Sequence, residues 1–315
     1  MANALASERF GLRRLSNWGR WGSSDEKGTC NFITDSVIRE AAKEVRRGVV
    51  FSCSVNFDSQ APIHPARPPV QRLMSALNVH GHEVGLPSTA IFNEDVLHMN
   101  VQAATQWDGL AHVGYDGCFY NGVGVDQVTS LHGARRNSAH QLGASLSTRG
   151  LLLDLVAHFG READGQLEPG HAVTAADLEA CARRQNSPPK SGDALLVRTG
   201  WTEHWYRHPD ARDGYFNTQP GLAVDTLEWL YDHEIACVAA DNSGVEVVPS
   251  QIAGEHVPFH MVALRDLGLT MGEVFDFGDL AADCGQDGRY TCLFVGPPLA
   301  LVGAVGSPLN PLAFK

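Results

Sequence analysis

Short apolar runs separated by helix-like segments are the feature that most constrains the fold of this chain. Three runs read as buried strands, namely residues 151–156 (LLLDLV), 194–199 (ALLVRT) and 236–240 (ACVAA). Between them, residues 174–184 and 224–233 place apolar side chains at helical spacing. Strands that alternate with helices in this way indicate an α/β architecture with a mixed sheet.

Other segments add elements to this alternation. Residues 35–48 predict a helix, with Thr34 as its N-cap and Gly48 as its stop, and residues 49–57 alternate like a strand. Residues 259–267 are a helix candidate, and two strands are expected around Pro297 and Pro298, at 292–295 and 299–302. Residues 70–100 show a mixed pattern that predicts neither a helix nor a strand.

The domain organisation predicted from this pattern is simple. Residues 1–33 are rich in Gly, Ser and Trp and read as an irregular N-terminal arm. Residues 34–315 contain no repeat, low-complexity segment or linker, so a single domain is the expectation.

Charge and cysteine content exclude several classes of partner. The formal net charge of -12 argues against nucleic acid and anionic membranes, because no basic patch would collect phosphates. Seven cysteines without a CxxC pair indicate free thiols in a reducing compartment. The start of the chain lacks the apolar core of a signal peptide, and no apolar run approaches ~20 residues. A cytoplasmic location is therefore expected.

The segment VQAATQWDGLAHVGYDGCFYNG, residues 101–122, points most directly to chemistry. It places Asp108 and His112 four residues apart, with Gln102 and Gln106 just upstream. A carboxylate and an imidazole so spaced can share a metal ion, or one can hold the metal while the other moves a proton. Amide oxygens are weak ligands that suit harder cations.

Further ligands would have to come from distant parts of the chain. His260 and Glu273 are credible donors, near the end of a helix and the turn that follows it. An ordinary structural interpretation stands beside this one: Asp108 could cap a turn, and His112 could be a hydrogen-bonded core histidine. The chain has 14 histidines, so such a pairing can arise by accident. The residues alone indicate a metal or acid–base site without deciding between them.

The same segment resembles the core motif of the metal-dependent cyclase-like hydrolases, a family that includes bacterial kynurenine formamidase and isatin hydrolase. That motif reads H-x-x-T-H-x-D-x-P-x-H, and five residues of this chain fall on its positions in register: Gln102, Thr105, Gln106, Asp108 and His112. Further blocks resemble the family in the expected order, among them residues 17–34, 148–155, 192–201, 240–249 and 306–314.

The resemblance implies a swivelling β/β/α-type fold and a divalent metal, Zn²⁺ or Mn²⁺. It implies that Asp108 is a metal ligand, that His112 acts in catalysis beside the metal, and that His260 and Glu273 complete the site. It also implies a homodimer or homotetramer.

The chain departs from the motif at the positions that the family uses to bind the metal. Glutamines at 102 and 106 replace both upstream histidines, and Leu110 replaces the proline. Three outcomes stay open: one ion held by Asp108, His260 and Glu273 with help from Gln106; a harder ion such as manganese; or loss of the metal. The first is favoured because the aspartate, both downstream residues and His112 persist.

Aromatic residues near the motif are candidate walls of a pocket for a ring-shaped substrate. Core packing is an equally good interpretation of Trp107, Tyr115, Phe119 and Tyr120. In the family the N-terminal arm packs near the active site, which makes Trp18 and Trp21 further candidates. Asp241 and Glu246 flank a turn after a strand, a common place for sites, although Asp241 could simply make turn hydrogen bonds.

The function predicted from these observations is metal-dependent hydrolysis of a small cyclic amide, aryl formamide or lactone, with His112 as proton shuttle. Ring closure, lactone hydrolysis, or a metal-free small-molecule-binding protein on the same scaffold are the alternatives. The glycine patterns lack the G-x-G-x-x-G frame, so no nucleotide cofactor is expected.

Overall fold

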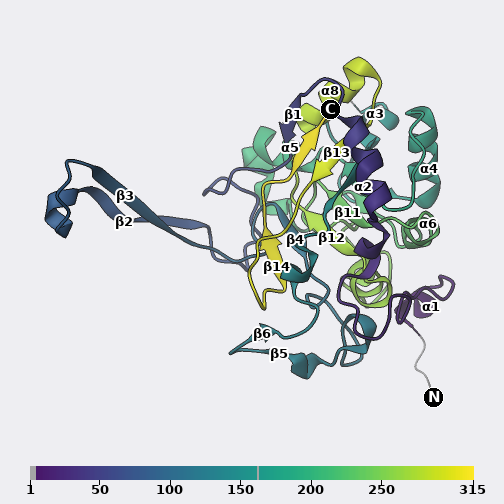
Figure 1. The fold of residues 1–315 in the computed structure, drawn as a ribbon. Helices are drawn as coiled ribbons and strands as arrows, with labels where there is room; N and C mark the ends of the chain where they lie inside the picture. Colours follow the sequence, from purple (N-terminus) through teal and green to yellow (C-terminus); the bar gives the residue numbers. More distant parts are fainter. Residues whose placement is uncertain (1–4, 162) are drawn as a thin grey trace.

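The computed structural model describes residues 5–161 and 163–315, and its centre is a curled, mixed nine-stranded sheet (Figure 1). The four central strands β7, β9, β11 and β12 run parallel, and the flanking strands pair antiparallel. The α/β fold with a mixed sheet is therefore confirmed. In sheet order the strands are β1 (Val50–Ser52), β15 (Leu312–Phe314), β13 (Thr291–Val295), β7 (Ser147–Asp154), β9 (Ala194–Arg198), β11 (Cys237–Ala240), β12 (Thr270–Glu273), β4 (Gln106–Asp108) and β14 (Gly306–Pro308).

Helices cover both faces of this sheet. The α-helices are α1 (Ala6–Arg9), α2 (Asp35–Ala41), α3 (Leu155–His158), α4 (Ala175–Arg184), α5 (Trp201–Arg207), α6 (Thr226–Asp232), α7 (Pro258–His260) and α8 (Gly278–Asp287). A π-helical segment, η8 (Met261–Leu267), follows α7 directly. Short pairs β8 (Ala172–Val173) with β10 (Gly221–Leu222), and β5 (Val128–Thr129) with β6 (Gly133–Ala134), lie outside the main sheet.

The alternation of side chains along the central strands builds two separate cores. On β9, Leu195 and Val197 face one core, which also contains apolar residues of α4, α6 and η8. Ala194 and Leu196 face the other core, which contains residues of α8 and the phenylalanines that precede it. Because both faces are covered, the strands read as continuous apolar runs rather than as alternating ones. For this reason the sequence pattern predicted β7, β9 and β11, whereas β12 was not predicted.

Helix α4 shows how the local sequence sets an element boundary. Thr174 is its N-cap: its hydroxyl accepts a hydrogen bond from the backbone nitrogen of Asp177, whose carboxylate in turn accepts one from the backbone nitrogen of Thr174. This reciprocal capping box satisfies two backbone donors that would otherwise lack partners. The buried Leu178, Cys181 and Ala182 then form its apolar face.

Several expected boundaries are wrong. The helix expected to reach Gly48 ends at Ala41 and continues as a short 3₁₀ turn to Glu44. Residues 299–302 are not a strand but an exposed loop, and the chain adds β14 and β15 after it. Residues 70–100, which the sequence left unassigned, form the antiparallel strands β2 (Gln71–His80) and β3 (Ile91–His98).

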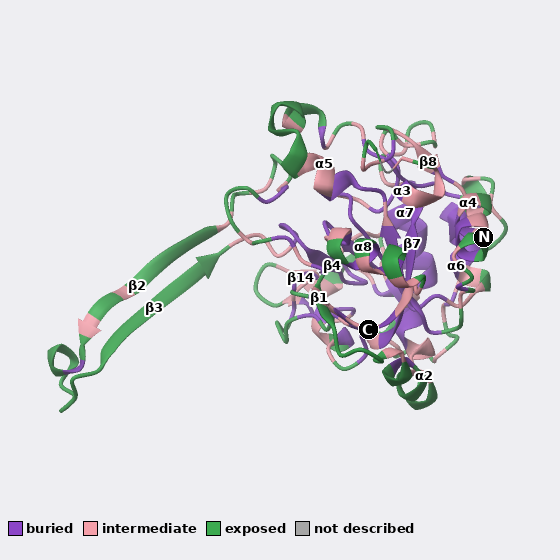
Figure 2. Ribbon diagram, turned by 90° about the horizontal axis from the view of Figure 1, so that it is seen from above, coloured by how far each residue is buried: buried purple, intermediate pink, exposed green. Residues whose placement is uncertain are grey.

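Strands β2 and β3 form a long two-stranded ribbon that projects from the body (Figure 1). We call residues 71–98 the projecting arm. It is exposed along almost its whole length (Figure 2). The N-terminal residues, by contrast, pack on the body: the backbone nitrogen of Asn17 donates to the Asp266 carbonyl at 3.0 Å. In the part of the chain that the structure describes, no helix is long and apolar enough to cross a membrane.

Candidate active site

Strands β4 and β12 place three polar side chains together inside the sheet. In their antiparallel register, Glu273 lies opposite Gln106, and Met271 lies opposite Asp108. Gln106 and Asp108 are two residues apart on a strand, so their side chains leave the same face. The Gln106 amide nitrogen donates to the Glu273 carboxylate at 2.6 Å, and all three residues are buried.

His260 enters the same space from the last residue of α7. Its Nε2 lies 3.2 Å from Glu273 Oε1 and 3.7 Å from Asp108 Oδ2. Its Nδ1 is hydrogen-bonded to Glu246, whose carboxylate also accepts the backbone N–H groups of Phe259 and His260 at 3.0 and 3.2 Å. Glu246 therefore fixes both the ring orientation of His260 and the start of α7. The π-helical segment that follows is a type of distortion frequently found at functional sites.

His112 reaches the group through a turn at the end of β4. The His112 backbone nitrogen donates to the Gly109 carbonyl at 2.9 Å, which turns the chain back on itself. His112 Nε2 then lies 3.7 Å from Asp108 Oδ1, and 24% of the side chain remains exposed. The structure thus brings Asp108, His112, His260 and Glu273 to one centre, with Gln106 beside them.

The chemistry of these groups fits a cation. Ligand atoms of Asp108, His260 and Glu273 all lie within 4.8 Å of one another. Among residues 5–161 and 163–315, neither Asp108 oxygen nor the Gln106 Oε1 has a hydrogen-bond partner, although all three atoms are buried. Buried carboxylate oxygens without partners are costly, and a metal ion would satisfy them. The cluster is a candidate site for a divalent metal.

The pKa values of Asp108 and His260 reflect the same crowding of charged groups. Burial raises the pKa of Asp108 to about 6, a rise that the nearby His112 opposes and Glu273 reinforces. Burial alone would lower the pKa of His260, but its hydrogen bonds to Glu246 and Glu273 outweigh that effect and raise the pKa to about 10. Without a cation, the cluster therefore favours an imidazolium at His260.

Gln102 is placed differently from Gln106. Its buried amide nitrogen has no hydrogen-bond partner within the described residues and lies beside Gly306, where a Cβ would come within 2.7 Å of it. Its backbone carbonyl accepts a hydrogen bond from Arg67. A ligand role for Gln102 stays a prediction.

A pocket of about 330 Å³ opens above the cluster. Its lining includes His112, Glu246, His260 and Glu273, together with the apolar side chains of Val113, Phe216, Val248 and Val257. The loop that leads into the projecting arm adds His64 and Arg67. The ring of His64 packs edge-on against Phe216 at 5.2 Å, which fixes this loop against the body.

The aromatic residues expected to line the pocket lie elsewhere. Trp107 leaves β4 on the opposite face from Asp108, is 0% exposed and packs against Phe275 and Phe294. The Tyr115 hydroxyl donates to Asp266, and Arg265 lies over its ring. Neither residue lines the pocket that contains His112, and Trp107 packs in the core.

The other aromatic candidates are likewise outside the pocket lining. Trp18 donates to the Arg265 carbonyl at 2.6 Å, and Trp21 packs edge-on against Phe32 at 5.0 Å. Phe119 is half-buried, with its ring beside Gly114. Sequence reasoning missed Arg67, His64 and Phe216, since none belongs to a recognisable motif. It noted Glu246 without assigning it a role, and Asp241 proves to bind the backbone of Thr199 and Gly200.

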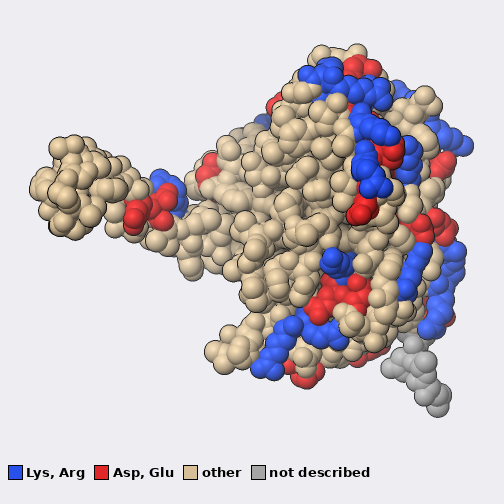
Figure 3. Space-filling view, viewed as in Figure 1, with Lys and Arg blue, Asp and Glu red and all other residues tan. Residues whose placement is uncertain are grey.

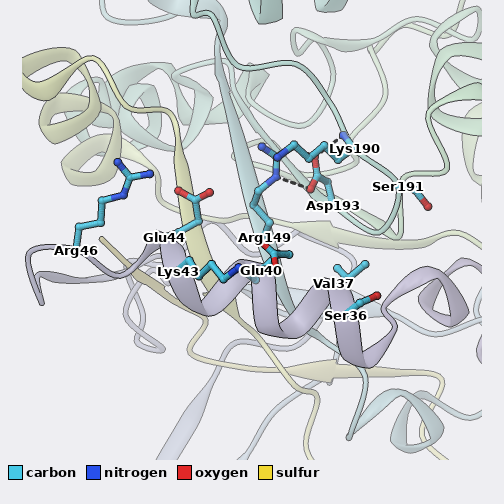
Figure 4. Close-up of a pocket in the computed structure, with 11 residues that line it drawn as sticks. Ser36, Val37, Glu40, Lys43, Glu44, Arg46, Arg149, Lys190, Ser191 and Asp193 are labelled. Carbon is cyan, nitrogen blue, oxygen red and sulfur yellow. Dashed lines mark hydrogen bonds and ion pairs between the residues drawn. The ribbon is translucent and has the colours of Figure 1, made fainter.

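A second cavity, of about 360 Å³, lies between α2 and the loop before β9 (Figure 4). It contains none of the site residues expected from the sequence. Its charged groups are largely paired, Arg149 with Asp193 and Lys43 with Glu40. These two ion pairs account for four of the charged side chains that line the groove.

Comparison with known proteins decides the family. The model of the cyclase family, described as "Putative cyclase", matches residues 51–247. The chain belongs to this cyclase family. A crystal structure of a novel cyclase is 38% identical to the chain, covers 96% of it and 98% of its own length, and superimposes with a TM-score of 0.87. No curated protein sequence matches this cyclase-family chain.

More distant structures share the fold of this chain. An isatin hydrolase bound to the product analogue thioisatinate is 17% identical, with 86% of this chain and 93% of that chain covered and a TM-score of 0.62. A predicted metal-dependent hydrolase from Bacillus stearothermophilus is 15% identical, with 85% and 98% covered and a TM-score of 0.51. At these identities, the two structures show that the fold is shared.

Proposed function

We propose that this cyclase-family protein is a metal-dependent hydrolase of a small cyclic amide, aryl formamide or lactone. One observation carries the proposal: the buried Asp108 oxygens have no hydrogen-bond partner in the described chain, although ligand atoms of Asp108, His260 and Glu273 lie within 4.8 Å of one another. The buried Gln106, whose Oε1 also has no partner there, is hydrogen-bonded to Glu273. Four side chains from β4, α7 and β12 would hold one divalent ion there.

The donors favour a hard ion. Asp108, Glu273 and Gln106 offer oxygen, and His260 offers one imidazole nitrogen. Carboxylate and carbonyl oxygens suit manganese, whereas zinc sites are usually richer in imidazole or thiolate. Gln106 can serve in this set because its nitrogen is bonded to Glu273, which leaves its oxygen free for the centre. We therefore propose Mn²⁺ ahead of Zn²⁺.

Each protein group has a separate task in the proposed reaction. When bound, a divalent ion would polarise the scissile carbonyl and lower the pKa of water. The Glu246 carboxylate accepts a hydrogen bond from the Nδ1–H of His260, which leaves the Nε2 lone pair for the centre. His112 is less buried than the proposed ligands and lines the pocket, which supports a role in taking a proton from water and passing it to the leaving nitrogen or oxygen.

The pocket supports a small, flat substrate. Its volume of about 330 Å³ is at the lower end of the range for ligand sites, and Val113, Phe216, Val248 and Val257 provide apolar walls for a ring. Ring opening of a cyclic amide or lactone creates a carboxylate. Arg67 at the pocket wall supplies a guanidinium that could receive this charge.

The direct test combines metal analysis with turnover of the purified protein. We expect manganese to co-purify or bind, and hydrolysis of at least one substrate in a panel of cyclic imides, aryl formamides and lactones. Replacing His112 by Asn should lower kcat by two or more orders of magnitude with metal content unchanged, since only the proton carrier is lost. His132→Asn, at an exposed histidine, is the matched control. Full activity of His112→Asn would remove the proton-shuttle role.

A metal-free binding protein is the second candidate, and a specific observation favours it. Two motif histidines are glutamines, and the carboxylates of Asp108, Glu246 and Glu273 surround His260, whose pKa of about 10 lets an imidazolium occupy the centre. This function predicts no rise in melting temperature on addition of Mn²⁺ or Zn²⁺ and no turnover of the panel. Ring closure is the reverse of hydrolysis. An assay with the open-chain acids as substrates distinguishes the two reactions.

A further inference from the structure

The groove between α2 and the loop before β9 has no task in the proposed reaction (Figure 4). Its volume is about 360 Å³, slightly more than the 330 Å³ of the pocket above the candidate metal centre, and the two share no lining residue. A volume of this size falls within the range of small-molecule sites, which begins at about 300 Å³. A ligand in this groove would therefore bind apart from the candidate metal centre.

Arg149 of the central strand β7 brings a buried guanidinium to the groove. Only 9% of its side chain is exposed. Its Nε donates to Asp193 Oδ1 at 2.8 Å, and its Nη2 donates to Asp193 Oδ2 at 2.5 Å and to the Pro188 carbonyl at 2.9 Å. The third nitrogen, Nη1, has no hydrogen-bond partner among the described residues and keeps contact with solvent. Its two N–H groups are available to a ligand.

Lys190 adds a second cation to the same part of the groove. Its backbone nitrogen donates to Asp193 Oδ2 at 2.8 Å, so Lys190 and Arg149 converge on one carboxylate. Its exposed side chain forms no hydrogen bond or ion pair with the residues that the structure describes. In Figure 4 the ends of both side chains lie on the same side of the groove, away from α2. Because Asp193 balances only Arg149, one positive charge remains here.

The other acidic side chains of the groove are engaged elsewhere. The Glu44 carboxylate accepts hydrogen bonds from Arg289 and from the Thr291 hydroxyl, at 3.1 and 2.9 Å. Glu40 pairs with Lys43, and both side chains are 69% exposed, so this ion pair contributes little and can open. Figure 3 shows basic side chains gathered over α2. In a chain with a net charge of -12, a groove with a surplus of positive charge selects for an anion.

We propose that this groove binds a small organic anion, with its carboxylate or phosphate group held by Arg149 Nη1 and Lys190 Nζ. Hydrogen bonds between these cations and an oxyanion are charge-assisted and therefore strong. Asp193 holds the Arg149 guanidinium in place before the ligand arrives, so little side-chain entropy is lost on binding. Val37 and Ala41 of α2 offer apolar contact to the carbon skeleton of the ligand.

Isothermal titration calorimetry of the full-length chain with inorganic phosphate and with succinate tests the proposal, and the two probes separate a phosphate ligand from a carboxylate ligand. We expect saturable binding of at least one probe. Lys190→Gln should weaken it at least about 10-fold, because a charge-assisted hydrogen bond is lost. The side chain is exposed, so its replacement leaves the fold intact. Lys27→Gln, at an exposed lysine outside the groove, is the matched control and should bind as the wild type does.

Two further measurements locate the bound anion. The pocket above the candidate metal centre also contains an arginine, so binding should persist in Arg67→Gln. A saturating concentration of the probe should protect Lys190 from acetylation, measured by peptide mass spectrometry, and leave Lys27 as reactive as in the free protein. Absence of saturable binding, binding that Lys190→Gln leaves unchanged, or binding that Arg67→Gln abolishes would each overturn the proposal. None of these readouts depends on hydrolysis, so they are independent of the proposed function.

Discussion

At the scale of single residues, the site depends on the face of β4 from which each side chain projects. Asp108 and Gln106 share a face with Glu273 through the β4–β12 register, whereas Trp107 between them is in the core. The motif spacing singled out Gln106 and Asp108, which the structure places on one face of β4. It could not show that the intervening tryptophan has the opposite orientation, because the three-residue strand is too short for its period to be recognised.

The sequence likewise did not predict the role of Glu246. Its carboxylate binds His260 and caps the start of α7 from thirteen or more residues away. Only the fold of the loop between β11 and α7 creates that contact. Local reasoning could place Glu246 near a strand end, but not opposite a particular imidazole.

Replacing Glu246 by Gln should weaken metal binding 10- to 100-fold, because His260 loses the acceptor that fixes its tautomer and raises its basicity. Competition with a metallochromic chelator measures the effect. Glu168→Gln, at an exposed carboxylate, should leave the affinity at the wild-type value. Wild-type affinity in Glu246→Gln would show that this carboxylate serves only the helix start.

Replacing Gln106 by His should shift metal preference toward zinc. An imidazole nitrogen in place of an amide oxygen binds borderline ions more strongly, so we expect Zn²⁺ affinity to rise at least about 10-fold relative to Mn²⁺. The surface variant Gln141→His controls for adventitious zinc binding. An unchanged Zn²⁺/Mn²⁺ ratio would place residue 106 outside the ligand set.

At the scale of elements, the sequence was most reliable where side chains are buried on both faces or where capping is local. Strands β7, β9 and β11 and helix α4 fall where the apolar runs and Thr174 predicted them. Residues 71–98 and 299–302 failed for a common reason. Their apolar side chains are exposed on the monomer, so the usual inference from apolarity to a buried element does not apply.

Removing the N-cap of α4 gives a local test of this reasoning. Thr174→Ala should lower the free energy of unfolding by about 1 kcal/mol, because a backbone N–H loses its acceptor and Asp177 loses its reciprocal bond. Denaturant unfolding measures it, with Thr89→Ala, at an exposed threonine outside any helix, as the comparison. Unaltered stability of Thr174→Ala would contradict the capping role.

At the scale of the whole molecule, the candidate centre joins distant parts of the chain. β4 begins at residue 106, whereas α7 and β12 lie between residues 258 and 273, and the sheet register brings them into contact. A ligand held by both regions binds the folded chain and not the unfolded one. It should therefore stabilise the entire fold, by about 2.7 kcal/mol at a free concentration 100 times Kd.

Thermal unfolding with and without Mn²⁺, compared between the wild type and Asp108→Ala, tests the metal centre most directly. Asp108 contributes two buried oxygens with no partner in the described residues, so its removal should abolish both the metal-dependent rise in melting temperature and the bound metal. The wild type should melt at a higher temperature with Mn²⁺, and the variant should not respond. Equal metal content and an equal shift in the two proteins would contradict a cation at this site.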